Sequence, residues 1–415
     1  MKFVFLHPDL GIGGAERLIV DFALAVKQNG HDVQMMTAHH DINHCFQETK
    51  DGTLDVTVVG DWIPRSIFGK CYALCAYLRM LAVALYLVFT KNPQFSTFDI
   101  IVCDQISVCI PVLKCFLRFR SKKNAKIIFY CHFPDQLLTR RDSLLKKFYR
   151  APIDWVEEVS TGLADCILVN SHFTAGIFRK TFTRLSDVEI DVLYPTCKFS
   201  TFDKPLSGDF ADLNVKRNVD AMFVSINRYE RKKNLPLALH AFVALESMVK
   251  KNNIAKTAHL IMVGGYDERV VENKEHFEEL IDLAQQLKIS DQVTFLKSQN
   301  ESQVQLLLHI STAVLYTPEN EHFGIVPLEA MYMKRPVIAC NSGGPLETII
   351  DGETGFLCDP SAESFAEAMY RFVIDKSLAR ELGINGHERV KTYFSFSAFV
   401  KKIKTIINDL SASSN

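Results

Sequence analysis

The sequence predicts an α/β protein with two doubly wound parallel sheets, one in each half of the chain. Three observations support this fold class. Short apolar runs alternate with stretches of helical periodicity in both halves, as in parallel sheets whose crossover connections are helices. Glycine-rich turns join strands to helices at 11–14 and 341–345. The length of 415 residues is sufficient for two domains that each bury a core of their own.

The first domain is expected over residues 1–197 and the linker over 198–218, which is polar and lacks periodicity. A strand at 3–6, the glycine loop at 11–14 and a helix at 15–28 open the first domain. Its further predicted strands are 32–37, 100–103, 126–131, 166–169 and 190–193.

The second domain is expected over residues 219–390, followed by a C-terminal segment, 391–415, in which Tyr393 to Leu410 form an amphipathic helix. The predicted strands of this domain are 222–226, 259–263, 293–296, 313–316 and 336–339, and its last predicted helices are 362–374 and 376–390.

Composition excludes some classes of function. A net charge of −1, without a basic stripe that carries stacking aromatic residues, argues against nucleic-acid binding. The 11 cysteines are scattered and show neither a Cys-x-x-Cys pair nor the spacing of a zinc site. Several lie in apolar runs, where reduced cysteine acts as a small hydrophobic residue. This usage favours the cytosolic side of a membrane over a lumen.

Residues 72–89 form an apolar run with one charge, Arg79. The run approaches the ~20 residues that span a bilayer, but a central arginine costs about 3 kcal/mol and offsets the gain from the apolar side chains. Three readings follow: a buried helix of the first domain, a helix in the membrane interface, and a span, which is the least favoured because it would divide a compact domain.

Basic residues near a second apolar run, 110–119, favour attachment of the first domain to an anionic membrane surface, although a solvated basic loop is the alternative. These residues are Arg118, Arg120, Lys122, Lys123 and Lys126.

The segment from Glu321 to Glu329 carries the strongest chemical signal. Two carboxylates bracket a turn at Phe323-Gly324-Ile325 that follows the predicted strand 313–316 and enters a helical pattern. Ligands of α/β sheets bind at the carboxyl ends of strands. The free N–H groups at a helix start favour an anion, and Gly324 lets the backbone approach a ligand closely. Taken alone, a helix start between two glutamates is usually structural.

Four cations follow the first strand of the second domain, and Arg228 and Lys233 form an Arg-x4-Lys pair among them. A departing nucleoside diphosphate gains negative charge, which fixed cations stabilise. Arginine binds phosphate oxygens in pairs, whereas lysine acts as a point charge. The chain contains no Asp-x-Asp pair, so the two cations are expected to serve without a metal ion. A run of cations is more often a solvated surface.

The glycine loop at 11–14 departs from the dinucleotide-binding fingerprint because position 16 is Glu16 rather than glycine. A dinucleotide-dependent oxidoreductase is therefore a weak reading, although the loop can still direct N–H groups at a diphosphate. His132 follows the predicted strand 126–131, and a lone histidine there is usually a structural hydrogen-bonding group. Asp135 could orient His132 or contact a ligand.

The segment 321–329 resembles the Glu-x7-Glu motif of retaining glycosyltransferases with the two-Rossmann-domain (GT-B) fold. The resemblance covers nearly the whole chain, and it is closest to mannosyltransferases of the dolichol pathway over the runs 130–135, 149–155 and 225–234. It implies a C-terminal helix that crosses back to the first domain, which would bind the acceptor, while the second binds the nucleotide sugar.

The resemblance also implies roles for single residues. Arg228 and Lys233 would clamp the donor diphosphate, Glu321 would face the transferred sugar, and Glu329 would bind the ribose. His132 would act as a catalytic or sugar-positioning group at the reacting centre. The remaining expected donor-binding residues are Gly13, Gly14, Phe323, Gly324 and Ile325, and the expected acceptor-binding residues are Gly11 and Asp135.

The activity implied by the resemblance is transfer of mannose from GDP-mannose to mannosylated dolichyl diphosphate chitobiose, first α-1,3 and then α-1,6, with retention and without a metal or other cofactor. It implies a place on the cytosolic face of the endoplasmic reticulum membrane, in a complex with neighbouring mannosyltransferases of the pathway. The alternatives are a retaining GT-B enzyme with another donor or acceptor, and a catalytically silent scaffold.

Overall fold

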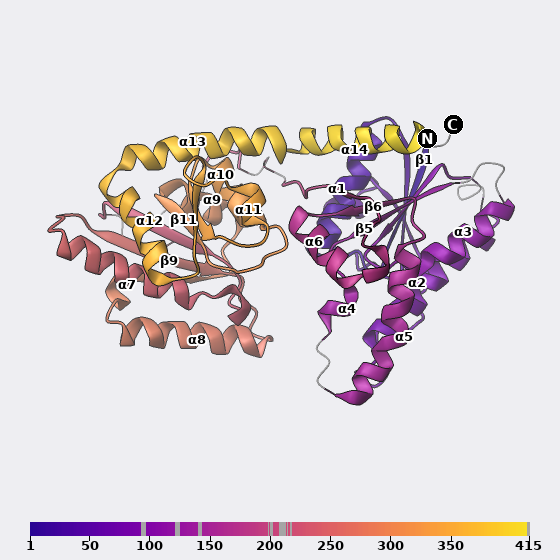
Figure 1. Ribbon diagram of the computed structural model, residues 1–415, viewed down its shortest axis with the longest axis horizontal. Helices are drawn as coiled ribbons and strands as arrows, with labels where there is room; N and C mark the ends of the chain where they lie inside the picture. The colour runs from indigo at the N-terminus through magenta and orange to yellow at the C-terminus, as the bar shows by residue number, and fades with distance from the viewer. Residues whose placement is uncertain are drawn as a thin grey trace. The chain divides into compact units, whose positions relative to one another are not determined.

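The computed structural model describes residues 1–92, 97–120, 125–139, 143–197, 199, 202–206, 213, 215 and 218–412, without the side chains of 116–120. The chain divides into two compact units (Figure 1). The first comprises Met1–Thr196 with Phe396–Asn415, and the second comprises Cys197–Ser395. The expected linker, 198–218, lies partly outside the described residues. Of its described residues, Phe199 stacks on Tyr332 of the second unit, with ring centroids 4.1 Å apart.

The first unit is built on a seven-stranded sheet in the order β3-β2-β1-β4-β5-β6-β7, with parallel pairings. The strands are β1 (Lys2–His7), β2 (Asp32–Thr37), β3 (Asp55–Val58), β4 (Ile100–Asp104), β5 (Lys126–Cys131), β6 (Cys166–Val169) and β7 (Ile190–Val192). The helices are α1 (Gly14–Gln28), α2 (Tyr72–Phe89), α3 (Cys109–Arg120), α4 (Asp135–Leu138), α5 (Leu144–Thr161), α6 (His172–Thr181) and α14 (Phe396–Ala412).

Alternate residues of β1 face the two layers of helices that cover this sheet, because side chains alternate along a strand. Phe3 and Phe5 pack into the core formed with α1 and α14, whereas Val4 and Leu6 pack into the core formed with α2 and α3. The C-terminal helix α14 therefore lies on α1 of the first unit (Figure 1), as predicted for the crossing helix.

The second unit is built on a six-stranded sheet in the order β10-β9-β8-β11-β12-β13, again with parallel pairings. Its strands are β8 (Ala221–Ile226), β9 (Ala258–Gly264), β10 (Val293–Lys297), β11 (Ala313–Tyr316), β12 (Val337–Cys340) and β13 (Gly355–Cys358). Its helices are α7 (Pro236–Lys251), α8 (Val271–Gln286), α9 (Glu301–Ile310), α10 (Ile325–Tyr332), α11 (Pro345–Thr348), α12 (Ala362–Ile374) and α13 (Lys376–Tyr393).

The predicted strands are all present, and the sheets contain two that the sequence analysis missed. Both are edge strands of four residues, β3 and β13. β3 alternates polar and apolar residues over too short a length to stand out, and β13 begins with a glycine. The break before the crossing helix also differs from the expected position at 390–391, because α13 continues to Tyr393 and α14 begins at Phe396.

In each sheet, successive strands are first added on one side of the first strand and then on its other side. The place where the side changes is the topological switch point. In the first sheet this point lies between β1 and β4, and in the second it lies between β8 and β11. The helices that follow the two strands cover opposite faces, which leaves a crevice at their carboxyl ends where open α/β sheets bind ligands. The loops after these four strands are therefore the first places to look for a site.

Helix α2 coincides with the apolar run 72–89. Among the described residues it is the one helix long and apolar enough to cross a membrane, yet it packs as a covering helix of the first sheet. Met80, Val83 and Leu87 are buried in the core. Arg79 is buried as well and donates to the Asp61 carboxylate at 2.7 Å. The opposite face exposes Tyr72, Leu74, Leu78, Leu85, Tyr86 and Phe89.

Candidate active site

In the second unit, the loops after β8 and β11 bring Lys233 and Glu321 together. Lys233 ends a short 3-10 helix, Arg231–Lys233, and its ammonium group donates to Oε2 of Glu321. The Thr317 hydroxyl, just after β11, donates to the Lys233 carbonyl at 2.7 Å and ties the two loops together. Burial by itself raises the pKa of Glu321, but the hydrogen bond and charge of Lys233 outweigh burial and lower it.

Arg228 follows β8 and keeps its charged end in solvent. Its side chain is 70% exposed, and the nearest carboxylate, Glu230, lies 3.6 Å away. Two glycines, the last residue of β9 and the residue after it, make room for the loop. A Cβ at Gly264 would overlap the Asn227 carbonyl, and one at Gly265 would lie 3.4 Å from Cγ of Arg228. These two glycines belong to the site, and the sequence analysis did not identify them.

The turn before α10 depends on Gly324, whose φ of +88° favours glycine. A Cβ there would lie 3.1 Å from the Tyr316 hydroxyl. Phe323 is buried, with its ring 5.9 Å from that of Phe394, and Ile325 begins the helix. Phe323, Gly324 and Ile325 therefore form the start of α10, whose first N–H groups lack partners within the helix.

The glycine turn after β12 packs against the backbone of Glu321. Gly343 has a φ of +66°, and a Cβ there would lie 2.8 Å from the Glu321 nitrogen and overlap its carbonyl oxygen. The N–H of Gly344 donates to that carbonyl at 2.7 Å. The turn thus fixes the backbone of the residue that pairs with Lys233.

Glu329 lies in α10 and is partly buried. Burial, followed by the charge of Glu301, raises its pKa to about 7. Within the part of the chain that the structure describes, its carboxylate has no hydrogen-bond partner. A partly buried carboxylate without a partner is suited to accept hydrogen bonds from a ligand.

In the first unit, four titratable side chains form a chain of contacts at the carboxyl ends of β1, β4 and β5. His7 and Asp104 are buried, and Nδ1 of His7 lies 2.6 Å from Oδ2 of Asp104. Nε2 of His132 lies 2.9 Å from the other oxygen, Oδ1. Nε2 of His7 faces Oε1 of Glu16 at 3.9 Å. His132 is therefore held by Asp104, and Asp104 is held by His7.

The charges in this chain of contacts reinforce one another. Burial by itself lowers the pKa of His7, but the hydrogen bond with Asp104 and the nearby Glu16 carboxylate outweigh it and raise the pKa to about 9. Burial by itself raises the pKa of Asp104, and the charge and hydrogen bond of His132, followed by those of His7, lower it. At neutral pH a cationic His7 thus lies between two carboxylates.

The glycine loop is shaped around Glu16. Gly13 is the N-cap of α1, and a Cβ there would overlap Oε2 of Glu16. The Glu16 pKa is lowered, because its interaction with His7, 3.9 Å away, and a hydrogen bond with its own backbone outweigh the effect of burial. The start of α1 therefore already holds a carboxylate. Gly11 and Gly14 have no contact closer than 3.9 Å at their Cβ positions, which leaves the rest of the loop open.

Asp135 does not contact His132, because it is held by Arg150. The Arg150 side chain is almost fully buried and donates to Asp135 at 2.8 Å and to Asp154 at 3.1 Å. Glu157 accepts the backbone N–H of Asp135 at 2.7 Å. Burial and the charge of Asp135 raise the Glu157 pKa to about 8. Arg150, in the run 149–155, and Glu157, just after it, thus anchor Asp135 and the start of α4.

The structure therefore brings the predicted residues together in two groups, one for each unit. Besides Gly264 and Gly265, it adds three residues that sequence reasoning missed, namely His7, Asp104 and Arg150. Asp104 directly follows the predicted strand 100–103, which is the only signal the sequence offers for it. Among the described residues, no group of three His, Cys, Asp or Glu side chains is placed to hold a metal ion.

Two family models match the chain. Residues 12–196 match Glycosyltransferase Family 4, and residues 211–389 match Glycosyl transferases group 1. Among solved structures, a sucrose-phosphate synthase from Thermosynechococcus elongatus is similar, with a TM-score of 0.72, 21% identity and coverage of 99% of both chains. Anabaena HepE, solved with UDP and glucose, has a TM-score of 0.67 and 17% identity, with coverage of 99% of this chain and 100% of HepE. At these identities the structures establish the GT-B fold.

Curated relatives are more closely similar. The alpha-1,3/1,6-mannosyltransferase ALG2 of Homo sapiens is 51% identical over 409 residues, which are 98% of this chain and 95% of that protein. The protein of the same name from Rhizomucor pusillus is 44% identical over 432 residues, with coverage of 100% of this chain and 92% of that protein. With these identities over nearly its whole length, the chain belongs to the family of alpha-1,3/1,6-mannosyltransferases within the GT-B glycosyltransferases.

Proposed function

We propose that the protein transfers mannose from GDP-mannose to mannosylated dolichyl diphosphate chitobiose, adding an α-1,3 and then an α-1,6 mannose with retention of configuration. The observation that carries the proposal is the Lys233–Glu321 pair at the switch point of the second sheet. It unites a cation suited to a leaving diphosphate with a carboxylate suited to a sugar. The two linkages follow the printed name of the relatives.

The donor is proposed to bind along the loops after β8 and β11. Lys233 would turn from Glu321 to the departing diphosphate as negative charge develops there, and the exposed Arg228 would bind phosphate oxygens in pairs. The first N–H groups of α10, near Gly324, would add the positive end of the helix dipole. Glu329 would accept hydrogen bonds from the ribose hydroxyls.

Glu321, once released by Lys233, would hold the hydroxyls of the mannose or its developing positive charge. Retention is proposed to follow same-face attack, in which a diphosphate oxygen accepts the proton of the acceptor hydroxyl. We propose that no metal ion is needed, because Arg228 and Lys233 provide the positive charge for the diphosphate. Full transfer after removal of divalent ions by EDTA is the expected result, and loss restored by manganese would contradict it.

The first unit is proposed to supply His132 to the reacting centre, with Gly11 and Asp135 on the acceptor. Asp104 would keep His132 in one orientation through the 2.9 Å hydrogen bond. Gly13 and Gly14 would approach the donor diphosphate, although Glu16 already lies at the start of α1. The donor diphosphate would therefore displace the Glu16 carboxylate or bind beside it.

We propose that the first unit attaches to the cytosolic face of the endoplasmic reticulum membrane, where neighbouring mannosyltransferases of the pathway would join it in a complex. The first turn of α2, which carries the exposed Tyr72 and Leu74, lies beside α5, since the Tyr149 hydroxyl accepts the N–H of Leu74 at 3.2 Å. On α5, Leu145 and Phe148 are 84% and 77% exposed. Together they form an apolar surface suited to the interface of a bilayer. Of the basic residues expected to help, Lys122 and Lys123 lie outside the described residues.

The enzymatic proposal is tested with purified protein, labelled GDP-mannose and a short-chain dolichyl diphosphate trisaccharide that bears one mannose. Two successive mass increments of one hexose are expected. Lys233→Ala should abolish turnover, while Lys232→Ala is the matched control because Lys232 is 72% exposed and pairs with Glu230. Equal activity of the two variants would refute the diphosphate role of Lys233. No transfer beside an active relative would favour the scaffold alternative, and transfer from another nucleotide sugar would favour another donor.

A further inference from the structure

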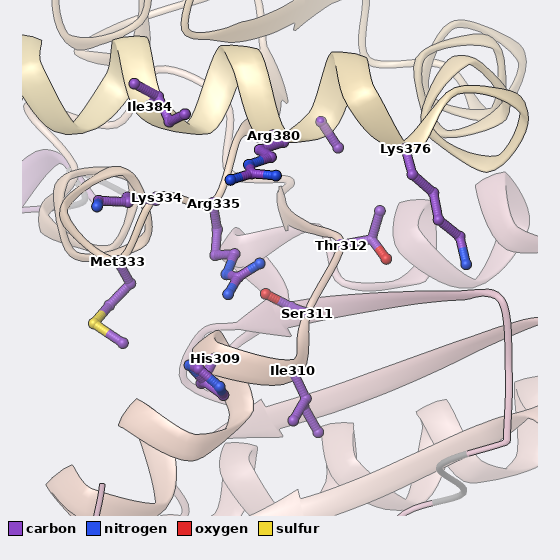
Figure 2. A pocket seen from close by; sticks show the side chains of 11 residues that line it. His309, Ile310, Ser311, Thr312, Met333, Lys334, Arg335, Lys376, Arg380 and Ile384 are labelled. Atoms are coloured by element: carbon purple, nitrogen blue, oxygen red, sulfur yellow. The ribbon is translucent and has the colours of Figure 1, made fainter. Parts of the chain in front are cut away.

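The second unit contains a cavity of about 580 Å³ at the edge of its sheet opposite the candidate active site. It opens where Ser311 and Thr312 precede β11 and where Lys334 and Arg335 precede β12, which are the amino ends of these strands. The candidate active site follows their carboxyl ends. The lining residues are His309, Ile310, Ser311, Thr312, Met333, Lys334, Arg335, Lys376, Ala379, Arg380 and Ile384 (Figure 2).

The lining is strongly basic in a chain whose net charge is −1. Four of its side chains are cationic, and no carboxylate is among the lining residues. Lys376 and Arg380 extend below α13, and Arg335 extends from the loop before β12 toward Ser311 (Figure 2). The carboxylate nearest to Lys376, that of Asp220, lies 3.7 Å away. Cations gathered in this way repel one another unless an anion joins them.

Among the four cations, Arg335 has a buried hydrogen-bond donor without an acceptor in the described part of the chain. Its Nε atom is buried and has no hydrogen-bond partner among the described residues. Burial lowers the pKa of its guanidinium, and no neighbouring carboxylate opposes that effect. A buried donor without a partner costs free energy, so the side chain is prepared for an acceptor that comes from outside the chain.

Favourable interaction with a helix dipole accounts for only two of the four cations. Lys334 and Arg335 follow the end of α10, where cations are favoured by the helix dipole. Lys376 and Arg380 lie in the first two turns of α13, where the positive end of the helix disfavours them. The first N–H groups of α13 are already capped by the Asp375 carboxylate, which accepts from Ser377 and Leu378. An anion in the cavity would therefore be stabilised by the cationic side chains rather than by the helix start.

The two hydroxyl groups of the lining add neutral donors. The Thr312 hydroxyl oxygen accepts the Met222 N–H at 3.0 Å, which leaves its own O–H to donate to a ligand. The Ser311 hydroxyl donates to the Leu308 carbonyl at 2.9 Å and can exchange this bond for a ligand oxygen. Guanidinium, ammonium and hydroxyl donors around one space form the donor set that phosphate oxygens require.

We propose that this cavity is a second anion site, separate from the donor site, which binds a ligand with two or more phosphate groups. Its volume lies within the ~300–1,000 Å³ of small-molecule sites, and its four cations balance the charge of a diphosphate or a bisphosphate. Such a group occurs in soluble pyrophosphate esters and in the headgroups of phosphorylated lipids. The shared chemistry is the paired phosphates.

The test is isothermal titration of the full chain with inorganic pyrophosphate in the presence of saturating GDP, which is expected to occupy the donor site. Arg335→Gln combined with Arg380→Gln should weaken binding by about tenfold or more, since it removes two charged hydrogen-bond donors from the cavity. The matched control, Lys250→Gln with Lys251→Gln, removes two exposed cations from the end of α7 and should bind as the unaltered chain does.

Two further variants keep the test decisive. Lys376→Gln changes a side chain that is 61% exposed, so it leaves the core intact and should weaken pyrophosphate binding even if the double variant does not fold. Lys233→Ala should leave this binding unchanged, which separates the cavity from the donor site and makes the outcome independent of the transferase activity.

A lipid source is tested by flotation with vesicles that contain phosphatidylinositol bisphosphate, against vesicles that match their charge with phosphatidylserine. Pyrophosphate binding without preference for the bisphosphate vesicles supports a soluble ligand. Vesicle binding that the Arg335 and Arg380 changes remove supports a phosphorylated headgroup. No pyrophosphate binding under saturating GDP, or binding that is equal in the double variant and its control, overturns the proposal.

Discussion

Replacement of Asp104 by asparagine tests the buried contacts that hold His132. Asp104 is fully buried between Nδ1 of His7, at 2.6 Å, and Nε2 of His132, at 2.9 Å. Asparagine preserves the shape of this side chain but removes its negative charge. His7 then keeps only the Glu16 carboxylate, 3.9 Å away, so its pKa should fall toward or below the ordinary value of 6.5.

The magnitude follows from the pKa of His7, which is about 9 in the folded protein against 6.5 ordinarily. This difference corresponds to about 3 kcal/mol of stability. Because the folded-state pKa is raised, the contribution is complete below pH 6.5 and is lost as the pH rises through 9. About 2 kcal/mol of it should disappear between pH 7 and pH 9. Asp104→Asn should lower stability at pH 7 by about 3–5 kcal/mol and remove this part of the pH dependence.

Urea unfolding followed by tryptophan fluorescence is the assay, because both tryptophans, Trp62 and Trp155, belong to the first unit. The raised pKa of Glu157, about 8, also makes the free energy of unfolding fall with rising pH. This contribution is the same in both proteins and cancels in their difference. Asp32→Asn, at an exposed position at the start of β2, is the control. If Asp104→Asn and the unaltered chain lose the same stability between pH 7 and pH 9, the assigned charge of His7 is wrong.

Three other changes test the candidate site and its supports. Glu329 has a pKa of about 7 and accepts two hydroxyls only when ionised. The KM for GDP-mannose should therefore fall about tenfold from pH 6 to pH 8. A KM that depends on pH equally in Glu329→Gln would contradict the ribose role. Gly343→Ala should cost about 2 kcal/mol or more and reduce turnover by displacing Glu321, while Gly352→Ala, with φ +73° but no atom near its Cβ, should cost about 1 kcal/mol and keep full turnover. The reasoning fails if the two glycine variants lose equal turnover. Arg150→Met should lower the urea stability of the first unit by about 3–5 kcal/mol because it breaks the ion pairs of the buried Arg150 with Asp135 and Asp154. An unchanged unfolding midpoint would show that Arg150 is not a structural anchor.

The periodicity of the sequence was sufficient for the two sheets because most strands are apolar runs bounded by turns. It failed at β3 and β13, which are short strands at the sheet edges. No residue of β3 is buried, so the apolar pattern that reveals a strand is weak there. β13 is apolar and mostly buried, but it has only four residues and begins with a glycine. The position of the crossing helix was predicted to within a few residues, since only Phe394 and Ser395 separate it from α13.

The candidate active-site residues of the second unit could be predicted because they lie in two short, contiguous motifs. The contacts of the first site could not be predicted in the same way. His7 and Asp104 are 97 positions apart, and they meet only because β4 pairs with β1. Asp135 is closer to His132 in sequence, yet Arg150 holds it elsewhere. Proximity along the chain is a poor guide to hydrogen bonding where strand order decides which side chains meet.

The return of α14 to the first unit has a consequence for biosynthesis. Phe399, Ile403 and Ile407 complete a core whose other members include Phe3 and Phe22 near the amino terminus. During translation, that apolar layer stays uncovered while the whole of the second unit is made. The first unit therefore completes its core only after α14 has been made, and until then its uncovered apolar layer is open to aggregation or to chaperone binding.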